Sequence, residues 1–207
     1  GRKPEYLRWT TTMEHQLFAA DQTPPKVTTG KKGVGKVAGG GGGSVGSFVQ
    51  FANSASLDPS LKPITVEAWV NTTKPNGVIV ARGGPKEGFA LTLSNGTPQF
   101  HIRSKDRLKT ISGKKRIVGG WHHVVGVLSA EKEMRLYVDG QRIAKGIAPG
   151  FLATNPLQKM EIGSDQASSV GEYPPNSGFS GAIDEVRLHY DEVSDKDVLA
   201  RFENNDD

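Results

Sequence analysis

The chain has 207 residues, with 26 basic and 22 acidic side chains, 35% hydrophobic residues, 26 glycines and no cysteine. Its length fits one large domain or two small ones, and the lack of cysteine excludes a disulfide scaffold, a thiolate nucleophile and a cysteine-ligated metal site. No stretch approaches the roughly 18 consecutive apolar residues of a membrane helix, so the sequence predicts no membrane span.

Residues 1–46 contain little that could build a core. A short strand is expected at 7–12, and residues 19–46 run through Pro24-Pro25 and five consecutive glycines, with almost no large apolar side chain. We therefore expect an N-terminal strand followed by a long loop or insert rich in Gly, Lys and Pro. The chain begins at Gly1 without an apolar segment, so a processed fragment lacking its signal peptide is expected.

From residue 47 onward, short apolar runs alternate with turn residues, which is typical of an antiparallel sandwich or barrel. Strands are predicted at 48–52, 64–70, 78–82, 89–94, 99–103, 121–129, 134–139, 160–163 and 182–190, with weaker candidates at 108–111 and 141–144. Asn95-Gly96 and Asp139-Gly140 supply the positive φ angles of type I′ hairpins. A short helix is predicted after Ser194, which can cap its first turn.

Residues 103–116 are the most basic part of the chain, with seven basic and one acidic side chain. Arg103, Lys105, Arg107 and Lys109 occupy alternate positions, so on one strand they would share a face, with cations roughly 6 to 7 Å apart. This spacing suits successive sulfates or carboxylates of a polysaccharide. A charged edge strand that prevents aggregation explains the same pattern. No aromatic side chains are interleaved, so nucleic-acid binding is not predicted.

Aromatic side chains that could stack on sugar rings are few. The candidates are Tyr173 and Phe151, in predicted loops, and Trp9, near the chain start. Of these, Tyr173 is the best candidate for a stacking platform. Trp69 and Trp121 lie within predicted strands, so they are expected to be core residues.

Catalytic motifs are weakly represented. Gln99-Phe-His101 has the Gln-x-His spacing found in some polysaccharide lyases, but the tyrosine-rich partner strand of such enzymes is missing. Glu131 and Glu133 flank Lys132 in a predicted turn, and no strand carries the paired carboxylates of a glycosidase. The sequence predicts a domain without catalytic activity of its own, and a polysaccharide-degrading enzyme is the less favoured alternative.

Several stretches in order carry a family resemblance: Phe48-Val-Gln-Phe, Ile64-Thr-Val-Glu-Ala-Trp-Val, Gly119-Gly-Trp-His-His-Val-Val-Gly-Val, Leu136-Tyr-Val-Asp-Gly and Phe179-Ser-Gly-Ala-Ile-Asp-Glu-Val-Arg-Leu. Through them, residues 47–204 resemble the laminin-G-like, concanavalin A-like jelly-roll domains. The resemblance implies an all-β fold, a two-sheet antiparallel β-sandwich with a short C-terminal helix, over residues 47–207. It also implies an extracellular or periplasmic location and a carbohydrate-binding or adhesive role.

The resemblance further implies a structural Ca²⁺ ion. Asp184 matches a position that commonly helps to organise such a site, with backbone carbonyls from the chain start as partners, and oxygen ligands suit calcium. The opening Leu7-Arg-Trp-Thr-Thr-Thr-Met-Glu departs from the usual acidic and glycine-rich start. An ion pair between Asp184 and Arg187 explains the same carboxylate equally well.

Together these features predict a non-catalytic carbohydrate-binding module of a secreted bacterial protein. Its partner would be a sulfated or uronic polysaccharide, or a glycoprotein glycan, held by Arg103, Lys105, Arg107 and Lys109, with Tyr173 stacking on a sugar ring. The alternative is a structural or interaction domain that packs against other domains of a secreted parent enzyme, such as a sulfatase or another hydrolase.

Overall fold

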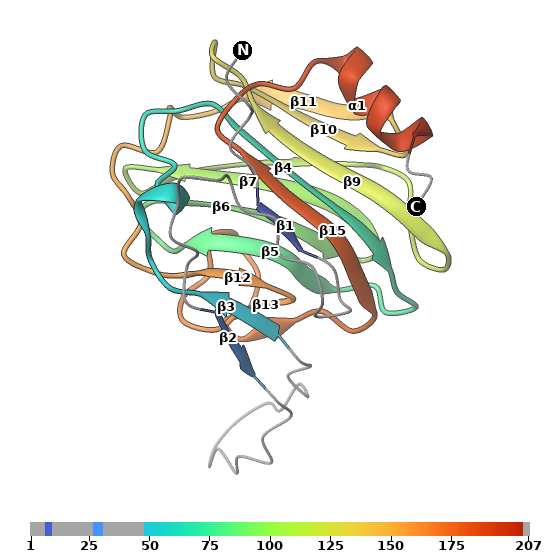
Figure 1. Cartoon of the computed structure of the whole chain (residues 1–207), viewed down its shortest axis with the longest axis horizontal. Helices are drawn as coiled ribbons and strands as arrows, with labels where there is room; N and C mark the ends of the chain where they lie inside the picture. Colours follow the sequence, from blue (N-terminus) through green and yellow to red (C-terminus); the bar gives the residue numbers. More distant parts are fainter. Residues whose placement is uncertain (1–6, 10–26, 31–47, 205–207) are drawn as a thin grey trace.

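The computed structural model describes residues 7–9, 27–30 and 48–204, and it describes side chains from residue 48 onward. These residues form two large antiparallel sheets that pack face to face, with one short helix near the C-terminus (Figure 1). The predicted two-sheet sandwich with a C-terminal helix is therefore confirmed.

Sheet A has six strands, in the spatial order β1 (Leu7–Trp9), β15 (Ala182–His189), β4 (Ile64–Asn71), β9 (Trp121–Leu128), β10 (Glu133–Val138) and β11 (Gln141–Ile147). Sheet B has seven, in the order β2 (Val27–Gly30), β3 (Phe48–Phe51), β12 (Met160–Ile162), β5 (Gly77–Gly83), β6 (Gly88–Ser94), β7 (Thr97–Ser104) and β8 (Arg107–Ser112). A short pair, β13 (Ser164–Asp165) and β14 (Ser177–Gly178), a 3-10 turn (Ala55–Leu57) and helix α1 (Asp195–Glu203) complete the described elements.

The N-terminal part differs from its predicted description. Leu7–Trp9 form β1, as expected, and pair with β15, whereas residues 10–12 lie outside the described residues. Val27–Gly30 form β2 at the edge of sheet B, although residues 19–46 were predicted to be a loop or insert. Val27, Thr28 and Thr29 are β-branched and favour a strand when β3 is available as a pairing partner. The composition of residues 19–46 alone does not show that such a pairing partner exists.

The core fills the space between the two sheets. Every second residue of β4 points inward, so Val66, Ala68 and Val70 are buried there. Gly126 on β9 lets the Phe100 ring approach from sheet B, because a Cβ at this glycine would lie 2.5 Å from that ring. The sheets therefore meet closely at this position, and side-chain size is constrained there.

Two tryptophans expected in the core lie outside it. Trp69 and Trp121 occupy the strand positions that face away from sheet B, and Trp121 is 46% exposed. The prediction of two core tryptophans is wrong, because the alternate positions of β4 and β9, such as Val70 and Val124, already fill the core. Val125 of β9 likewise lies on the outer face, under α1.

Helix α1 covers part of the outer face of sheet A (Figure 1). Ser194 caps it, as predicted, by accepting a hydrogen bond from the backbone N–H of Asp197. Val198 is buried against the outer face, and the Phe202 ring stacks on Trp69 with 5.7 Å between centroids. None of the helices in the described residues is both long and apolar enough to cross a bilayer.

Candidate functional site

The basic segment folds as a hairpin rather than as a single strand. Lys105 and Asp106 form the turn between β7 and β8, with φ angles of 51° and 65°. Positive φ at both turn residues is the geometry of a two-residue type I′ hairpin. The prediction that Arg103, Lys105, Arg107 and Lys109 share one face of a strand is therefore wrong, because the chain reverses direction between them.

Arg103 lies on the outer face of sheet B. It is the register partner of Leu108 in β8, and its Nε donates to the Val170 carbonyl at 2.7 Å. Its Nη1 donates to the Asp106 carbonyl at 3.2 Å, across the hairpin turn. Arg103 is half-buried, so this guanidinium mainly fixes a neighbouring loop and the turn.

Arg107 and Lys109 point to the other side of β8. Lys109 is the register partner of Ile102, whose side chain is in the core, so both side chains leave the strand toward sheet A. A Cβ on Gly146 of β11 would lie 3.2 Å from Lys109 Cε. Arg107 donates from Nη2 to the Pro149 carbonyl at 2.8 Å, and both cations are exposed.

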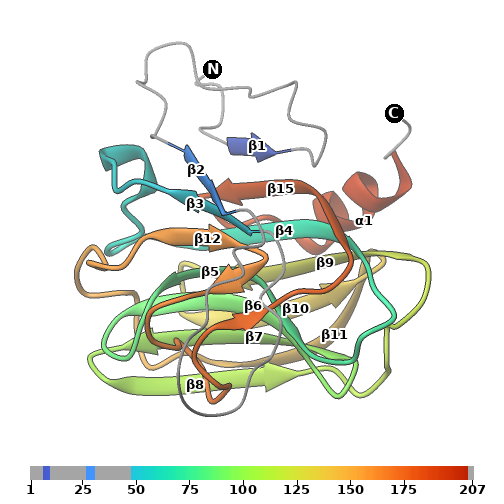
Figure 2. The same ribbon diagram turned by 90° about the horizontal axis from the view of Figure 1, so that it is seen from below.

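These cations line one side of the sandwich. β8 is the outermost strand of sheet B, β11 is the outermost strand of sheet A, and the two lie next to each other (Figure 2). The loop that follows β8 adds further exposed cations and is anchored where Ile117 N–H donates to the Gly96 carbonyl at 2.9 Å. We call the following set of exposed residues the basic edge: Lys105, Arg107, Lys109, Lys114, Lys115 and Arg116.

The basic edge has little compensating negative charge within the described residues, although the Glu87 carboxylate accepts the Lys105 backbone N–H at 2.9 Å. None of its six cations forms an ion pair there, and Asp106 is the only acidic residue between 103 and 116. Four arginines elsewhere in the described residues do pair with carboxylates, namely Arg135, Arg142, Arg187 and Arg201. Apart from the Arg107 donor used on the Pro149 carbonyl, the basic edge therefore keeps its side-chain hydrogen-bond donors and its positive potential available to an external anion.

Tyr173 does not present its ring as a free platform. Its hydroxyl donates to Asp165 Oδ2 at 2.8 Å, and its ring packs against a small cluster that contains Val170 and Ala90. Burial, followed by the nearby Asp165 charge, raises the pKa of the Tyr173 phenol. The structure thus gives Tyr173 an anchoring role for the loop 164–178 over sheet B, and it separates Tyr173 from the basic edge.

His101 lies beneath the same loop. Its Nε2 hydrogen-bonds the Thr92 hydroxyl at 2.8 Å and its Nδ1 hydrogen-bonds the Thr110 hydroxyl at 2.9 Å. Burial, and then the charge of Arg103, lowers the pKa of His101 to about 4. The Tyr173 ring meets His101 edge-on at 5.5 Å, so the structure brings together a His and a Tyr that sequence reasoning did not pair.

Asp184 lies on the outer face of sheet A, where its Oδ1 accepts the backbone N–H of Glu185 at 2.8 Å. Arg187 pairs with Glu185 at 2.6 Å instead of with Asp184. The described residues contain no group of three or more His, Cys, Asp or Glu side chains that could hold a metal ion. A Ca²⁺ ion at Asp184 would need further oxygen ligands, such as the expected backbone carbonyls of the chain start, of which only Leu7–Trp9 are among the described residues, and the calcium site stays a prediction.

A buried carboxylate lies beneath α1. Glu67 is fully buried, with Arg201 Nη1 at 2.7 Å and His123 Nε2 at 3.2 Å. Burial alone would raise the pKa of Glu67, but hydrogen bonds from His123 and His189 and the charge of Arg201 hold it far below its usual range. A cavity of about 400 Å³ lies beside this cluster, and its lining includes Arg201 and Arg187, which both face Glu67.

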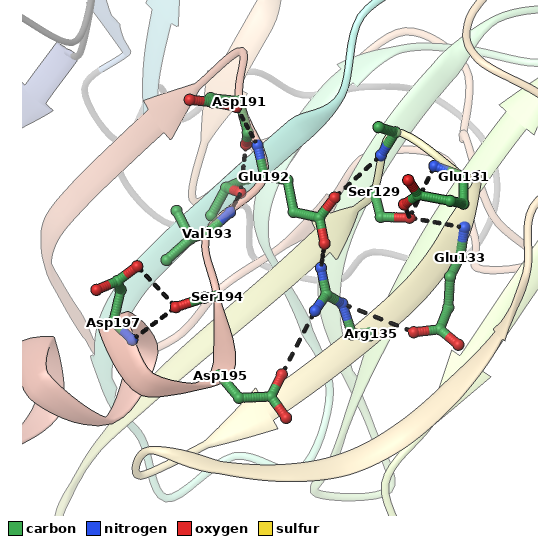
Figure 3. Close-up of polar contacts among 12 residues, drawn as sticks. Ser129, Glu131, Glu133, Arg135, Asp191, Glu192, Val193, Ser194, Asp195 and Asp197 are labelled. Carbon is green, nitrogen blue, oxygen red and sulfur yellow. Dashed lines mark hydrogen bonds and ion pairs between the residues drawn. The ribbon is translucent and has the colours of Figure 1, made fainter.

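A second charged network fixes the segment before α1 (Figure 3). Arg135 of β10 contacts Glu192 and lies 3.4 Å from Asp195 Oδ1, while its Nε lies 3.8 Å from Glu133. The Tyr137 hydroxyl donates to Asp195 Oδ1 at 2.5 Å. One arginine thus meets three carboxylates, so the network holds the segment before α1 on sheet A and keeps a net negative charge.

Residues 41–199 match the family model of the concanavalin A-like lectin/glucanases superfamily. The chain belongs to this superfamily. Human laminin subunit alpha-3 is 30% identical over 120 residues, which is 58% of this chain and 4% of that protein. The chain spans no more than 4% of the length of the curated relatives it matches.

Solved structures share the lectin-like sandwich at low sequence identity. A botulinum neurotoxin type C structure, from work on its interaction with two ganglioside molecules, has a TM-score of 0.67 and 12% identity, over 97% of this chain and 50% of that one. A Ruminococcus gnavus sialidase CBM40 bound to alpha2,3 sialyllactose has a TM-score of 0.55 and 18% identity, over 69% and 83%. At these identities the likeness supports the fold, and the resemblance seen in the sequence is confirmed.

Proposed function

We propose that this domain is a non-catalytic glycan-binding module of a secreted bacterial protein, and that it holds an anionic polysaccharide along the basic edge. The observation that carries the proposal is the set of exposed, unpaired cations on one side of a lectin-like sandwich. The similar folds of a sialidase module bound to sialyllactose and of a toxin that interacts with gangliosides support a glycan as the ligand class.

The geometry of the basic edge suits an extended polymer. β8 has six residues, which span roughly 20 Å at the usual strand rise, and cations lie at its start, along it and in the loop after it. Arg and Lys donate charge-assisted hydrogen bonds to sulfate or carboxylate groups. Because the cations are exposed, salt screens this attraction over about 8 Å at physiological ionic strength. Binding should therefore weaken steeply as salt is added.

A catalytic role is disfavoured by the surroundings of the most enzyme-like residues. Both ring nitrogens of His101 are occupied by threonine hydroxyls, and the side chain is 2% exposed. Tyr173 is tied to Asp165, and burial raises its pKa, whereas a catalytic base needs a pKa near the working pH. A substrate would have to displace the loop that holds both residues before either could act.

The test is affinity electrophoresis through gels that contain a sulfated polysaccharide or its desulfated counterpart, at low and high salt. The variant carries Lys105→Gln, Arg107→Gln and Lys109→Gln. The matched control removes three exposed lysines elsewhere, through Lys74→Gln, Lys159→Gln and Lys196→Gln. Both variants lose the same net charge, so a difference between them reports position rather than overall charge.

We expect the sulfated gel alone to retard the wild type at low salt. The control should keep most of this retardation, whereas the basic-edge variant should bind roughly 100-fold more weakly, since each lost contact is worth about 1 kcal/mol. Equal retardation of the two variants would contradict the site.

If the wild type passes all gels unretarded, the interaction-domain alternative gains weight. Two loop leucines, Leu61 and Leu157, are 71% and 94% exposed, and a neighbouring domain of a parent protein could cover such side chains. In that case, Leu157→Ser would weaken attachment to the parent protein without changing the stability of the domain.

A further inference from the structure

The outer face of sheet A is only partly covered. Phe202, near the end of α1, stacks over Trp69, and the next row of the sheet lies beyond this contact. That row runs across three strands, from Ala182 on β15 through Asn71 on β4 to Trp121 on β9, which are register partners. Asp184 lies one outward-facing position along β15 from Ala182, beside Trp69.

Trp121 is the distinctive member of this row. Among the described residues it is the one aromatic side chain in the set of exposed large hydrophobic residues. Gly119 and Gly120, which precede it, adopt φ angles of 83° and 79°, and a Cβ on either would meet no atom within 4 Å. The backbone that leads into Trp121 therefore borders open space, and neither glycine places a side chain there.

Hydrogen bonds fix the backbone around Trp121. His122 Nδ1 hydrogen-bonds Asp139 Oδ2 at 2.8 Å, and the N–H of Gly119 donates to the Thr72 carbonyl at 2.7 Å. These contacts fix the backbone on both sides of the indole. A rigid aromatic surface loses little conformational entropy when a ligand stacks on it.

Polar groups with spare hydrogen-bonding capacity lie along the same face. The Asn71 side-chain amide forms no hydrogen bond within the described residues, and it neighbours Trp121 at cross-strand distance. Asp184 uses only Oδ1, so its Oδ2 has no partner among those residues. Ala182, the register partner of Asn71, carries only a methyl group on this face.

We infer that Trp121, Asn71 and Asp184 form a second glycan-binding site, here called the Trp121 site, which takes a neutral pyranose ring. The apolar face of such a ring would stack on the indole, while its hydroxyl groups would donate to Asp184 and exchange hydrogen bonds with the Asn71 amide. One aromatic ring flanked by an amide and a carboxylate offers no match for a polyanion. The site is thus chemically distinct from the basic edge, and it does not depend on the function proposed there.

The test uses affinity electrophoresis at high salt, where binding to the basic edge is screened. The gels contain a neutral glucan, mannan, xylan or galactan. The variants are Trp121→Ala, Trp121→Phe and Asn71→Ala, and the triple-glutamine variant of the basic edge serves as the matched control. Thermal unfolding of each variant checks that the fold is retained.

We expect at least one neutral gel to retard the wild type and the triple-glutamine variant equally. Trp121→Ala should bind on the order of ten-fold more weakly, equivalent to about 1.4 kcal/mol, and Trp121→Phe should recover part of the loss because its ring still stacks. Asn71→Ala should bind more weakly with an unchanged melting temperature.

Three results would overturn the Trp121 site: no retardation in any neutral gel, equal retardation of Trp121→Ala and wild type, or a loss confined to the sulfated gel at low salt. The last result would mean that Trp121 contributes to binding of the sulfated polymer at the basic edge. The first two results do not depend on whether the basic edge itself binds a sulfated polymer.

Discussion

The buried carboxyl group of Asp165 predicts how the stability of the domain changes with pH. This carboxylate is 3% exposed, accepts the Tyr173 hydroxyl at 2.8 Å and lies near Glu161. Burial, with a smaller contribution from Glu161, raises the pKa of Asp165 to about 6 from 3.8. The folded protein therefore keeps a proton on Asp165 over a pH range in which the unfolded chain has released it. The stability from this proton is complete below about pH 3.8 and is lost as the pH rises through about 6.

The expected size follows from the shift of about two pKa units. Each unit corresponds to 1.36 kcal/mol, so ionised Asp165 costs on the order of 3 kcal/mol at neutral pH. Asp165→Asn cannot ionise, and its amide oxygen can still accept the Tyr173 hydroxyl. Relative to the wild type, this variant should gain about 3 kcal/mol of unfolding free energy between about pH 4 and pH 8.

Urea denaturation of both proteins across this pH range measures the difference. His101 and Glu67 also make stability depend on pH, because both have lowered pKa values and favour folding as the pH rises. They are present in both proteins, so their effects cancel in the difference. Glu172→Gln, an exposed change in the same loop, is the control and should show no such trend. A difference that does not change with pH would refute this account of Asp165.

Three further predictions concern packing, turn geometry and the helix contact. Gly126→Ala should destabilise the domain by about 1 to 3 kcal/mol in urea denaturation, because the new methyl group would meet the Phe100 ring. Asp106→Gly should raise the unfolding free energy by about 0.5 kcal/mol, because glycine adopts the 65° φ of the hairpin turn without strain. Tyr137→Phe should cost about 1 to 2 kcal/mol, since it removes the hydrogen bond to Asp195, and fluorescence-detected unfolding would measure the loss.

The strands of the sandwich could be predicted because their local signals agree with their tertiary environment. Asn95-Gly96 and Asp139-Gly140 form turns with positive φ at both residues, as their composition predicts. Lys105-Asp106 adopts the same geometry without a glycine, so its composition does not indicate a reversal of the chain there. Because of this turn, Arg103 and Lys109 lie on opposite faces of sheet B. The expected row of cations on one strand is therefore replaced by cations along the edge of the sandwich.

The positions of the tryptophans and of Tyr173 could not be obtained from sequence periodicity. Alternation shows which strand residues share a face, but it does not show which face meets the other sheet when both carry apolar side chains. On β9 the outward residues Val125 and Val127 are apolar because α1 covers them. Tyr173 depends on a partner in a different element, Asp165, and no local pattern relates the two.

The fold leaves two chemically different surfaces exposed, and each suits a different kind of glycan. The loop that carries Tyr173 covers part of the outer face of sheet B, and α1 covers part of the outer face of sheet A. Among the described residues, the surfaces that stay open include the basic edge, which would bind through charge, and the Trp121 row, which would bind through stacking. Lys105 and the loop before Trp121 lie at opposite ends of β8, roughly 20 Å apart, so substitutions at the two places should act independently. For a polymer with both neutral and sulfated residues, the losses of binding free energy caused by Trp121→Ala and Lys105→Gln should therefore add. A loss in the double variant smaller than the sum of the two single losses would mean that the two surfaces bind the same segment of the ligand.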